Sequence, residues 1–458
     1  MSIKTIGIMT GNSLDAVDAV LCEFDNGHIK DLAFCTRQYP AELTDDVIRL
    51  RAQIAAHDGD PVFLENNPFF ERVLKNYTLL TAQAVNALCD QSGINKSDIA
   101  AVGWHGQTCG HFPPSIAGRQ QPYTLQVADA VRLADLTDLP VIYDFRSDDL
   151  MNGGEAAPLA PVHNRHIAAD LREKGAFPVA FCNAGNTGNI AIISETNDHR
   201  DVTQGWDIGP FNHFADMLVR SAKGEPYDPD GRYGRQGQIV MELLSELFDT
   251  AAVTNEGKNF YLQPPPKSSD PGWYRLDLQA AQREYGFKNT LRTIEYLSAY
   301  TFLYTLSFIP ENVRMPHTFL LFGGGWKNPV VLEDFKELLK GNGPVLDRHK
   351  ALFERIRTRF SNPPLADFSD RYGYSGAYME ARIFADMAKC RITGEPFSFP
   401  ETTGCKTPTI AGIYILPRTT EKTYLLTRLM EQYQTTGLIK NEWNKKYSRA
   451  AKGWQNGF

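Results

Sequence analysis

The sequence has no apolar run long enough to cross a membrane, no block of basic residues and no C-x-x-C motif. It carries 47 Lys and Arg against 54 Asp and Glu, a net charge of -7, which argues against nucleic acid or an anionic membrane as the main partner. The amino terminus lacks the basic and apolar segments of an export signal. Seven scattered cysteines indicate neither a disulfide framework nor a structural zinc site. We therefore expect a cytoplasmic protein with a small-molecule ligand.

A glycine-rich element that follows an apolar run occurs three times in the chain. The copies are Thr5 to Asp15, Val179 to Asn189 and Thr318 to Gly325. Glycine and hydroxyl residues at such turns let backbone N–H groups approach a polyphosphate closely, and a nearby aspartate can hold its metal. Two similar hairpins about half a chain apart, with a third loop, predict a duplicated ATP-binding fold rather than a Rossmann domain.

The chain is long enough, and at 42% hydrophobic residues apolar enough, for two domains with a large core. Alternating and helical patterns predict an opening unit that the region after residue 178 repeats. The proline-rich stretch 263–274 is expected to be a loop. The predicted domains are 1–145, completed by a returning helix at 373–395, then 146–372, and a C-terminal segment and tail at 396–458. The predicted strands are 3–9, 16–24, 32–39, 99–104, 123–127 and 141–145, with helices at 41–57, 68–92 and 129–138.

Several motifs together resemble those of one family and occur in its order. They are Gly11-Asn12-Ser13-Leu14-Asp15, Trp104-His105-Gly106-Gln107-Thr108, Asp144-Phe145-Arg146 with Asp149, Asn183 to Asn189, Asp207-Ile208-Gly209-Pro210, Gly323-Gly324-Gly325 with Asn328, and Glu380. The chain resembles the anhydro-N-acetylmuramic acid kinases and the related levoglucosan kinases, of the actin, hexokinase and heat-shock ATPase superfamily, from about residue 6 to 417. This resemblance implies an α/β, actin-like (ribonuclease H-like), duplicated two-domain ATPase fold with an interdomain cleft.

The resemblance also implies two catalytic carboxylates. Opening a 1,6-anhydro ring requires a base that takes a proton from water, and the resemblance assigns this role to Asp207. Without the resemblance, an aspartate followed by Ile-Gly-Pro would be interpreted as an ordinary turn residue. Glu380 lies where the family has a substrate-contacting glutamate, although on its own it would be read as a solvated helix residue.

The remaining site residues fall into two groups. The resemblance implies a sugar site of His105, Gln107, Asp144, Arg146 and Asp149, where Arg146 contacts either a substrate carboxylate or a partner across domains. Lys267 reaches a ligand or is a surface lysine. Asp15 is expected to hold Mg²⁺, and the glycine loops to hold ATP, although a plain hairpin turn or tight packing would also use glycine. The predicted ATP-binding residues are Gly11, Asn12, Ser13, Asp15, Asn183, Gly185, Gly209, Gly323, Gly324, Gly325 and Asn328.

The predicted reaction is ATP-dependent opening of 1,6-anhydro-N-acetylmuramic acid with phosphorylation at O6, in a homodimeric enzyme. The chain departs from the family pattern in one loop, where Ser269-Asp270-Pro271-Gly272 replaces Thr-Gly-Arg-Glu after Pro265-Pro266-Lys267-Ser268. This departure leaves two alternatives open. One is a levoglucosan-like anhydrosugar kinase, and the other is a sugar- or nucleotide-binding homologue with impaired catalysis.

Overall fold

The computed structural model describes residues 2–11, 14–117, 121–269 and 271–417. The chain divides into two compact units: residues 1–163 with 378–458, and residues 164–377. The predicted boundaries were 145/146 and 372/373. The predicted tail, 418–458, lies outside the described residues, as do Asn12, Ser13 and Asp270.

The first unit is built on a six-stranded sheet with the order β13-β7-β4-β1-β2-β3. The first three strands form an antiparallel meander, β4 and β7 continue it in parallel with β1, and β13 closes the edge antiparallel to β7. The strands are β1 Ile3–Thr10, β2 Ala16–Asp25, β3 His28–Gln38, β4 Ala101–Trp104, β7 Val141–Tyr143 and β13 Ile413–Ile415. The first two antiparallel strands and their connecting loop agree with the predicted opening hairpin.

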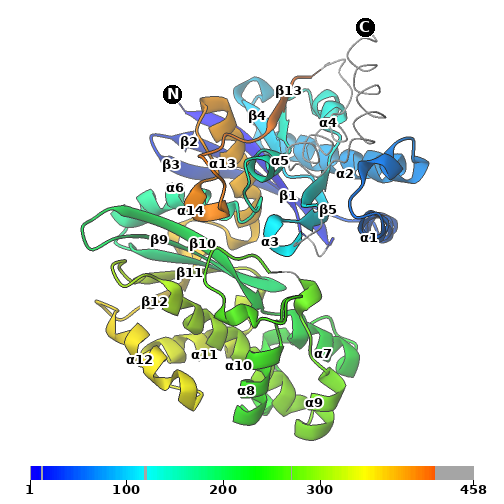
Figure 1. The fold of residues 1–458 in the computed structure, drawn as a ribbon. Helices are drawn as coiled ribbons and strands as arrows, with labels where there is room; N and C mark the ends of the chain where they lie inside the picture. The colour runs from blue at the N-terminus through cyan, green and yellow to red at the C-terminus, as the bar shows by residue number, and fades with distance from the viewer. Residues whose placement is uncertain (1, 12–13, 118–120, 270, 418–458) are drawn as a thin grey trace. The chain divides into compact units, whose positions relative to one another are not determined.

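Helices cover both faces of this sheet because successive side chains of a strand point to opposite sides. Ile6 and Ile8 belong to the core that α1 (Ala41–Ala56), α2 (Pro68–Ser92) and α4 (Ala130–Thr137) cover. Gly7 faces α13 (Met379–Thr393), so close that an added Cβ would lie 2.0 Å from the Ala381 carbonyl oxygen. Figure 1 shows α13 in orange beside β1 and β2.

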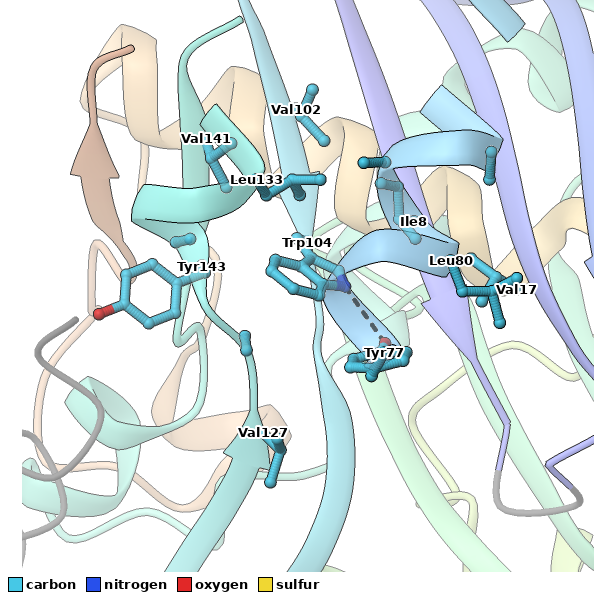
Figure 2. Close-up of a cluster of buried hydrophobic side chains, with 14 of the residues drawn as sticks. Ile8, Val17, Tyr77, Leu80, Val102, Trp104, Val127, Leu133, Val141 and Tyr143 are labelled. Atoms are coloured by element: carbon cyan, nitrogen blue, oxygen red, sulfur yellow. Dashed lines mark hydrogen bonds between the residues drawn. The ribbon is translucent and has the colours of Figure 1, made fainter. Parts of the chain in front are cut away.

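Buried polar atoms of this core are paired with one another. Figure 2 shows the indole of Trp104 and the ring of Tyr77 among aliphatic side chains, and the indole N–H donates to the Tyr77 hydroxyl at 3.2 Å. The same hydroxyl lies 3.0 Å from Oγ1 of Thr10, at the end of β1. Helix α2 begins where Asn67 accepts hydrogen bonds from the first backbone N–H groups and ends at Gly93, which has a left-handed conformation. The predicted helices at 41–57, 68–92 and 129–138 correspond to α1, α2 and α4 and are confirmed to within two residues at each end.

The second unit repeats this arrangement. Its sheet has the order β10-β9-β8-β11-β12, with β8, β9 and β10 antiparallel and with β11 and β12 parallel to β8. The strands are β8 Val179–Ala184, β9 Thr187–Glu195, β10 Asp201–Pro210, β11 Thr318–Phe322 and β12 Leu365–Phe368; the helices are α7 His213–Lys223, α8 Met241–Thr250, α9 Leu278–Tyr285, α10 Phe287–Thr305, α11 Pro329–Lys340 and α12 Lys350–Thr358.

Both sheets place their first five strands, counted along each unit, in the spatial order third, second, first, fourth and fifth. The shared order and directions confirm the predicted α/β class and its duplication. The predicted strand 123–127 is confirmed as β6, whereas sequence patterns did not predict β10, which carries Asp207, nor β5, the partner of β6 in a separate ribbon. The remaining elements are β5 Gln107–Phe112, β6 Tyr123–Val127, α3 Pro114–Ala117, α5 Ser147–Met151, α6 Ala160–Glu173 and α14 Pro400–Thr403, with short 3₁₀ turns between elements.

All seven cysteines are buried and free. In the described part of the chain, no helix combines the length and apolar character needed to cross a membrane.

Candidate active site

Asp207 lies near the end of β10, where the pairing with β9 shifts register between Asp207 and Gly209. The proline-rich loop after residue 262 runs alongside: the Asp207 N–H donates to the Lys267 carbonyl at 3.0 Å. The carboxylate is held by the same loop, because the Ser269 N–H donates to Oδ2 at 2.9 Å and the Ser268 hydroxyl donates to it at 3.2 Å. All carboxylate bonds found among the described residues go to Oδ2, which leaves Oδ1 available to accept a proton.

The environment makes Asp207 a stronger base than an exposed aspartate. Burial raises the pKa of Asp207, and this outweighs the bonds from Ser269 and Ser268 and the attraction of Lys267, which lower it. The residue is half-buried. A carboxylate fixed through one oxygen, with a raised pKa, fits the general base that the sequence predicted.

Lys267 contradicts both readings that the sequence allowed. It is 7% exposed, its ammonium donates to the Phe260 carbonyl at 3.1 Å, and it lies 4.6 Å and 4.9 Å from the ring centres of Phe260 and Phe308. It is therefore neither a surface lysine nor a side chain that extends toward a ligand. The reason is local: the backbone pairing with Asp207 turns the Lys267 side chain into the interior of its unit.

A cavity of about 400 Å³ lies entirely within the second unit. Its walls bring together four segments that are remote in sequence: the start of α7, the stretch 227–230, helix α10, and the glycine loop after β11 with the start of α11. The residues that line it are Phe211, Asn212, Ala215, Asp216, Tyr227, Asp228, Pro229, Asp230, Glu295, Ser298, Gly324, Gly325, Lys327, Asn328 and Val331. Three predicted ATP-binding residues, Gly324, Gly325 and Asn328, are among them.

The glycines beside this cavity meet different steric demands. A Cβ on Gly323, whose φ is +92°, would lie 2.6 Å from the Ala184 carbonyl oxygen and from Oδ1 of Asn183, and one on Gly325 would lie 2.4 Å from the Phe211 ring. Gly324 meets nothing within 4 Å. Gly323 and Gly325 are thus required for packing, whereas Gly324 presents bare backbone to the cavity.

Carboxyl groups dominate the polar lining. Burial raises the pKa of Asp216 to about 6, and burial together with the nearby Asp228 raises the pKa of Glu295 to about 8. Asn328 holds Glu295 by donating to Oε1 at 2.8 Å. Such a lining accepts hydrogen bonds from hydroxyl and amino groups. Sequence reasoning missed Glu295, although a single acid in the otherwise uncharged run 293–303 was an available signal.

Gly185 and Gly209, also predicted to bind ATP, do not line this cavity. The Gly185 carbonyl accepts from the Asn212 N–H at 3.2 Å, which ties the β8–β9 turn to the segment before α7. Gly209 has a φ of +133°, and an added Cβ would lie 2.8 Å from the Tyr261 ring. Gly209 therefore has a structural reason for glycine, whereas an added Cβ on Gly185 would meet only the Thr187 carbonyl oxygen, at 3.5 Å.

In the first unit, carboxylates gather near the loop between β1 and β2. Asp15 is exposed, and its Oδ1 accepts from the Ala16 N–H at 3.1 Å. Asp18 is half-buried and accepts from the Thr36 hydroxyl at 2.6 Å. Its pKa is raised by burial, and Asp15 raises it further. Gly11, at the start of the loop, is half-buried.

Glu380, in the first turn of α13, belongs to the same group. Desolvation by the surrounding protein raises its pKa first, Asp18 and Asp15 raise it further, and Arg146 opposes them. Its side chain is exposed to solvent. The structure thus brings Asp15, Glu380 and Arg146 into one electrostatic neighbourhood.

Arg146 is held in position by two acceptors. Its Nε donates to Nε2 of His105 at 2.9 Å, and Nη1 donates to the Ala156 carbonyl at 2.5 Å. Because arginine only donates, His105 must accept through Nε2 and is neutral. This agrees with its pKa, which burial lowers well below the usual value and Arg146 lowers further. His105 is only 3% exposed, and its hydrogen bond orients the Arg146 guanidinium.

The other three predicted sugar-site residues are buried and bonded within their unit. Gln107 accepts from the Tyr39 hydroxyl at 2.9 Å. Asp144 accepts from the Ser147 hydroxyl at 2.5 Å, at the start of α5. Asp149 is fully buried, with Oδ1 bonded by Thr403 and Oδ2 by the Ala156 N–H. Because these polar groups are already paired, they stabilise the segment that carries Arg146.

Comparison with known proteins gives one consistent match. The family model for anhydro-N-acetylmuramic acid kinase matches residues 3–417. The anhydro-N-acetylmuramic acid kinase of Rhodopseudomonas palustris (strain BisB18) is 30% identical over 412 residues, 90% of this chain and 99% of that protein. The same-named protein of Nitrobacter winogradskyi is 29% identical over 419 residues, 91% of this chain and all of that one. Among solved structures, a ROK hexokinase from Thermus thermophilus is 14% identical, and the match covers 84% of this chain and 97% of the hexokinase chain. Its TM-score is 0.33, which is too low to support a functional comparison.

Proposed function

The chain belongs to the anhydro-N-acetylmuramic acid kinase family, and from this premise we propose that it is an ATP-dependent kinase of 1,6-anhydro-N-acetylmuramic acid. Water adds to the anomeric carbon, the bond between that carbon and O6 breaks, and O6 takes the γ-phosphoryl group of ATP. The products are N-acetylmuramic acid 6-phosphate and ADP. One proton must leave the attacking water.

The observation that carries the proposal is the geometry of Asp207. Its Oδ2 is fixed by the Ser269 N–H and the Ser268 hydroxyl, while the bonds described leave Oδ1 to accept the proton of water. Burial raises its pKa, which brings its basicity closer to neutral pH. Ser269, the first residue that departs from the family pattern in this loop, supplies a backbone N–H and a hydroxyl beside this carboxylate, which supports the proposal.

The cavity of the second unit suits the nucleoside end of ATP. Carboxyl groups such as Asp216 and Glu295 can accept hydrogen bonds from ribose hydroxyls and the adenine amino group. Gly324 offers bare backbone at the cavity wall, where a nucleotide can approach closely.

The carboxylates of the first unit fit a divalent cation. Asp15 and Asp18 raise the pKa of Glu380, and Asp15 raises that of Asp18, so these groups repel one another, and a hard cation with oxygen ligands would relieve the repulsion. Asp15 would hold Mg²⁺, which when bound neutralises charge on the phosphates. Arg146, oriented by His105, would bind the sugar carboxylate, and Glu380 would contact the sugar. The homodimer stays a prediction of the resemblance, and the cytoplasmic location stays a prediction from the sequence composition.

Mass spectrometry of the sugar product tests the reaction. The protein is incubated with ATP, Mg²⁺ and either 1,6-anhydro-N-acetylmuramic acid or levoglucosan in oxygen-18 water. We expect the first sugar to be phosphorylated and to gain one heavy oxygen, as attack of water on the anomeric carbon requires. Phosphorylation of levoglucosan alone would reassign the substrate, and no phosphorylation of either sugar at high protein concentration would overturn the kinase assignment.

A further inference from the structure

Lys267 is a buried cation on the loop that holds the proposed base. Its ammonium donates to the Phe260 carbonyl and lies against the rings of Phe260 and Phe308. Its carbonyl accepts from the Asp207 N–H. The same residue therefore bonds the backbone of the base and carries a buried positive charge on the same loop.

Among the described residues, Asp207 is the charged group that acts on Lys267, and Lys267 is the charged group that acts on Asp207. The neighbouring titratable side chains are two tyrosines. Tyr274 shares a hydrogen bond with the Ser269 hydroxyl, and burial raises the pKa of Tyr261 well above its usual value, which keeps that phenol neutral.

We propose that Lys267 is a positioning residue for the reaction: its carbonyl holds the backbone of Asp207, and its ammonium, buried on the same loop, favours the charged carboxylate. The inference rests on the proposed function, since it assigns Lys267 a role through the base of that reaction. Lys267 does not touch the substrate, because its ammonium is bonded to Phe260 in the interior of the unit.

The chemistry explains why a cation is retained there. Burial disfavours the ionised form of Asp207, and a carboxylate that is protonated cannot take a proton from water. A nearby ammonium offsets that burial. Burial lowers the pKa of Lys267 to about 7, against the attraction of Asp207, so the ammonium carries its charge mainly below neutral pH. This is the range in which Asp207 would otherwise become protonated.

The test compares the pH dependence of kcat/KM for the wild type, Lys267→Met and Lys267→Arg, with the anhydrosugar as variable substrate. Met has similar length and no charge, and Lys267→Gln serves as a second neutral variant should Met not fold. Phe308→Leu is the matched control, because it changes the packing around the ammonium and keeps the charge. Each variant is also assayed for the KM of ATP.

We expect the acid limb of the Lys267→Met profile to move to higher pH by roughly half to one unit, the order that a nearby charge produces. The KM for ATP should stay within about twofold, since Lys267 does not line the nucleoside cavity. Lys267→Arg should restore most of the shift, and Phe308→Leu should leave the limb in place.

Two results would overturn the proposal. A uniform loss of kcat/KM at every pH, with the limb unmoved, would show a purely structural role, and a loss confined to the KM of ATP would show a nucleotide contact. The two proposals fail separately: turnover of the sugar with an unmoved limb removes the role of Lys267 alone, whereas a wild type without sugar turnover overturns both.

Discussion

Replacing Asp207 by Asn separates catalysis from folding and from nucleotide binding. The amide has the size of the carboxylate, and its oxygen can still accept from the Ser269 N–H at Oδ2. What it loses is the ability to take a proton. Loss of a general base costs about 10²- to 10⁴-fold in rate, which corresponds to about 3–5 kcal/mol of transition-state free energy.

The same structure predicts that stability changes little. Burial raises the pKa of Asp207, so its folded-state stabilisation is greatest at low pH and falls as the pH rises through the interval between the unfolded and folded pKa values. Above that interval, an uncharged Asn avoids the cost of burying the charge. We expect the free energy of unfolding of Asp207→Asn at pH 8 to be equal to that of the wild type or higher, within about 1 kcal/mol.

Three measurements check this prediction. They are sugar phosphorylation by mass spectrometry, ADP binding by calorimetry and urea unfolding, each compared with the wild type. The Kd of ADP should stay within about twofold, because Asp207 is not among the cavity residues. If Asp207→Asn retained more than about a tenth of the wild-type kcat, the assignment of the base would be refuted. A large loss of stability would refute the argument from its pKa.

Three further outcomes follow from the packing and charges described. Gly7→Ala should lower the free energy of unfolding by roughly 3 kcal/mol or more, because its Cβ would lie 2.0 Å from a backbone oxygen of α13. Gly27→Ala has no atom within 4 Å of its Cβ and a φ of +85°, and it should lower the free energy of unfolding by only about 1 kcal/mol. Urea unfolding of both variants measures the difference. The melting temperature of Glu295→Gln relative to that of the wild type should increase as the pH rises from 5 to 8. The reason is that the protonated wild-type Glu295, whose pKa is raised to about 8, stabilises the fold at low pH and loses this stabilisation as it ionises. Asp216→Asn should weaken ADP binding about tenfold at pH 7.5 in calorimetry, and the difference should shrink below pH 6, where the wild-type acid is protonated.

The sequence alone was enough for the fold class and its duplication. Strand and helix periods are local properties of the chain, and the repeated apolar run with a glycine turn marks where each unit starts. The first hairpin, α2 and the hairpin at 179–193 were therefore predictable. The C-terminal tail was not tested, since it lies outside the described residues.

For the site, the sequence identified candidate residues but not their surroundings. Residue type and order identified Asp15, Asp207 and Glu380 as candidates, but not which predicted groups are already paired. Asp149 reads like a ligand-binding acid in sequence, and its burial against Thr403, 254 positions away, appears only after folding. Glu295 was missed because helical periodicity does not show that distant segments form a cavity around a helix residue.

The sequence by itself determined which segments become strands and helices and which loops are rich enough in glycine to approach a phosphate, because these depend on residues close together in the chain. Tertiary structure decided the chemistry. The bond from Ser269 to Asp207, 62 positions apart, and the burial of Lys267 arise when distant segments pack. Burial and neighbouring charge set the pKa of a side chain, and neither is a property of the residue alone.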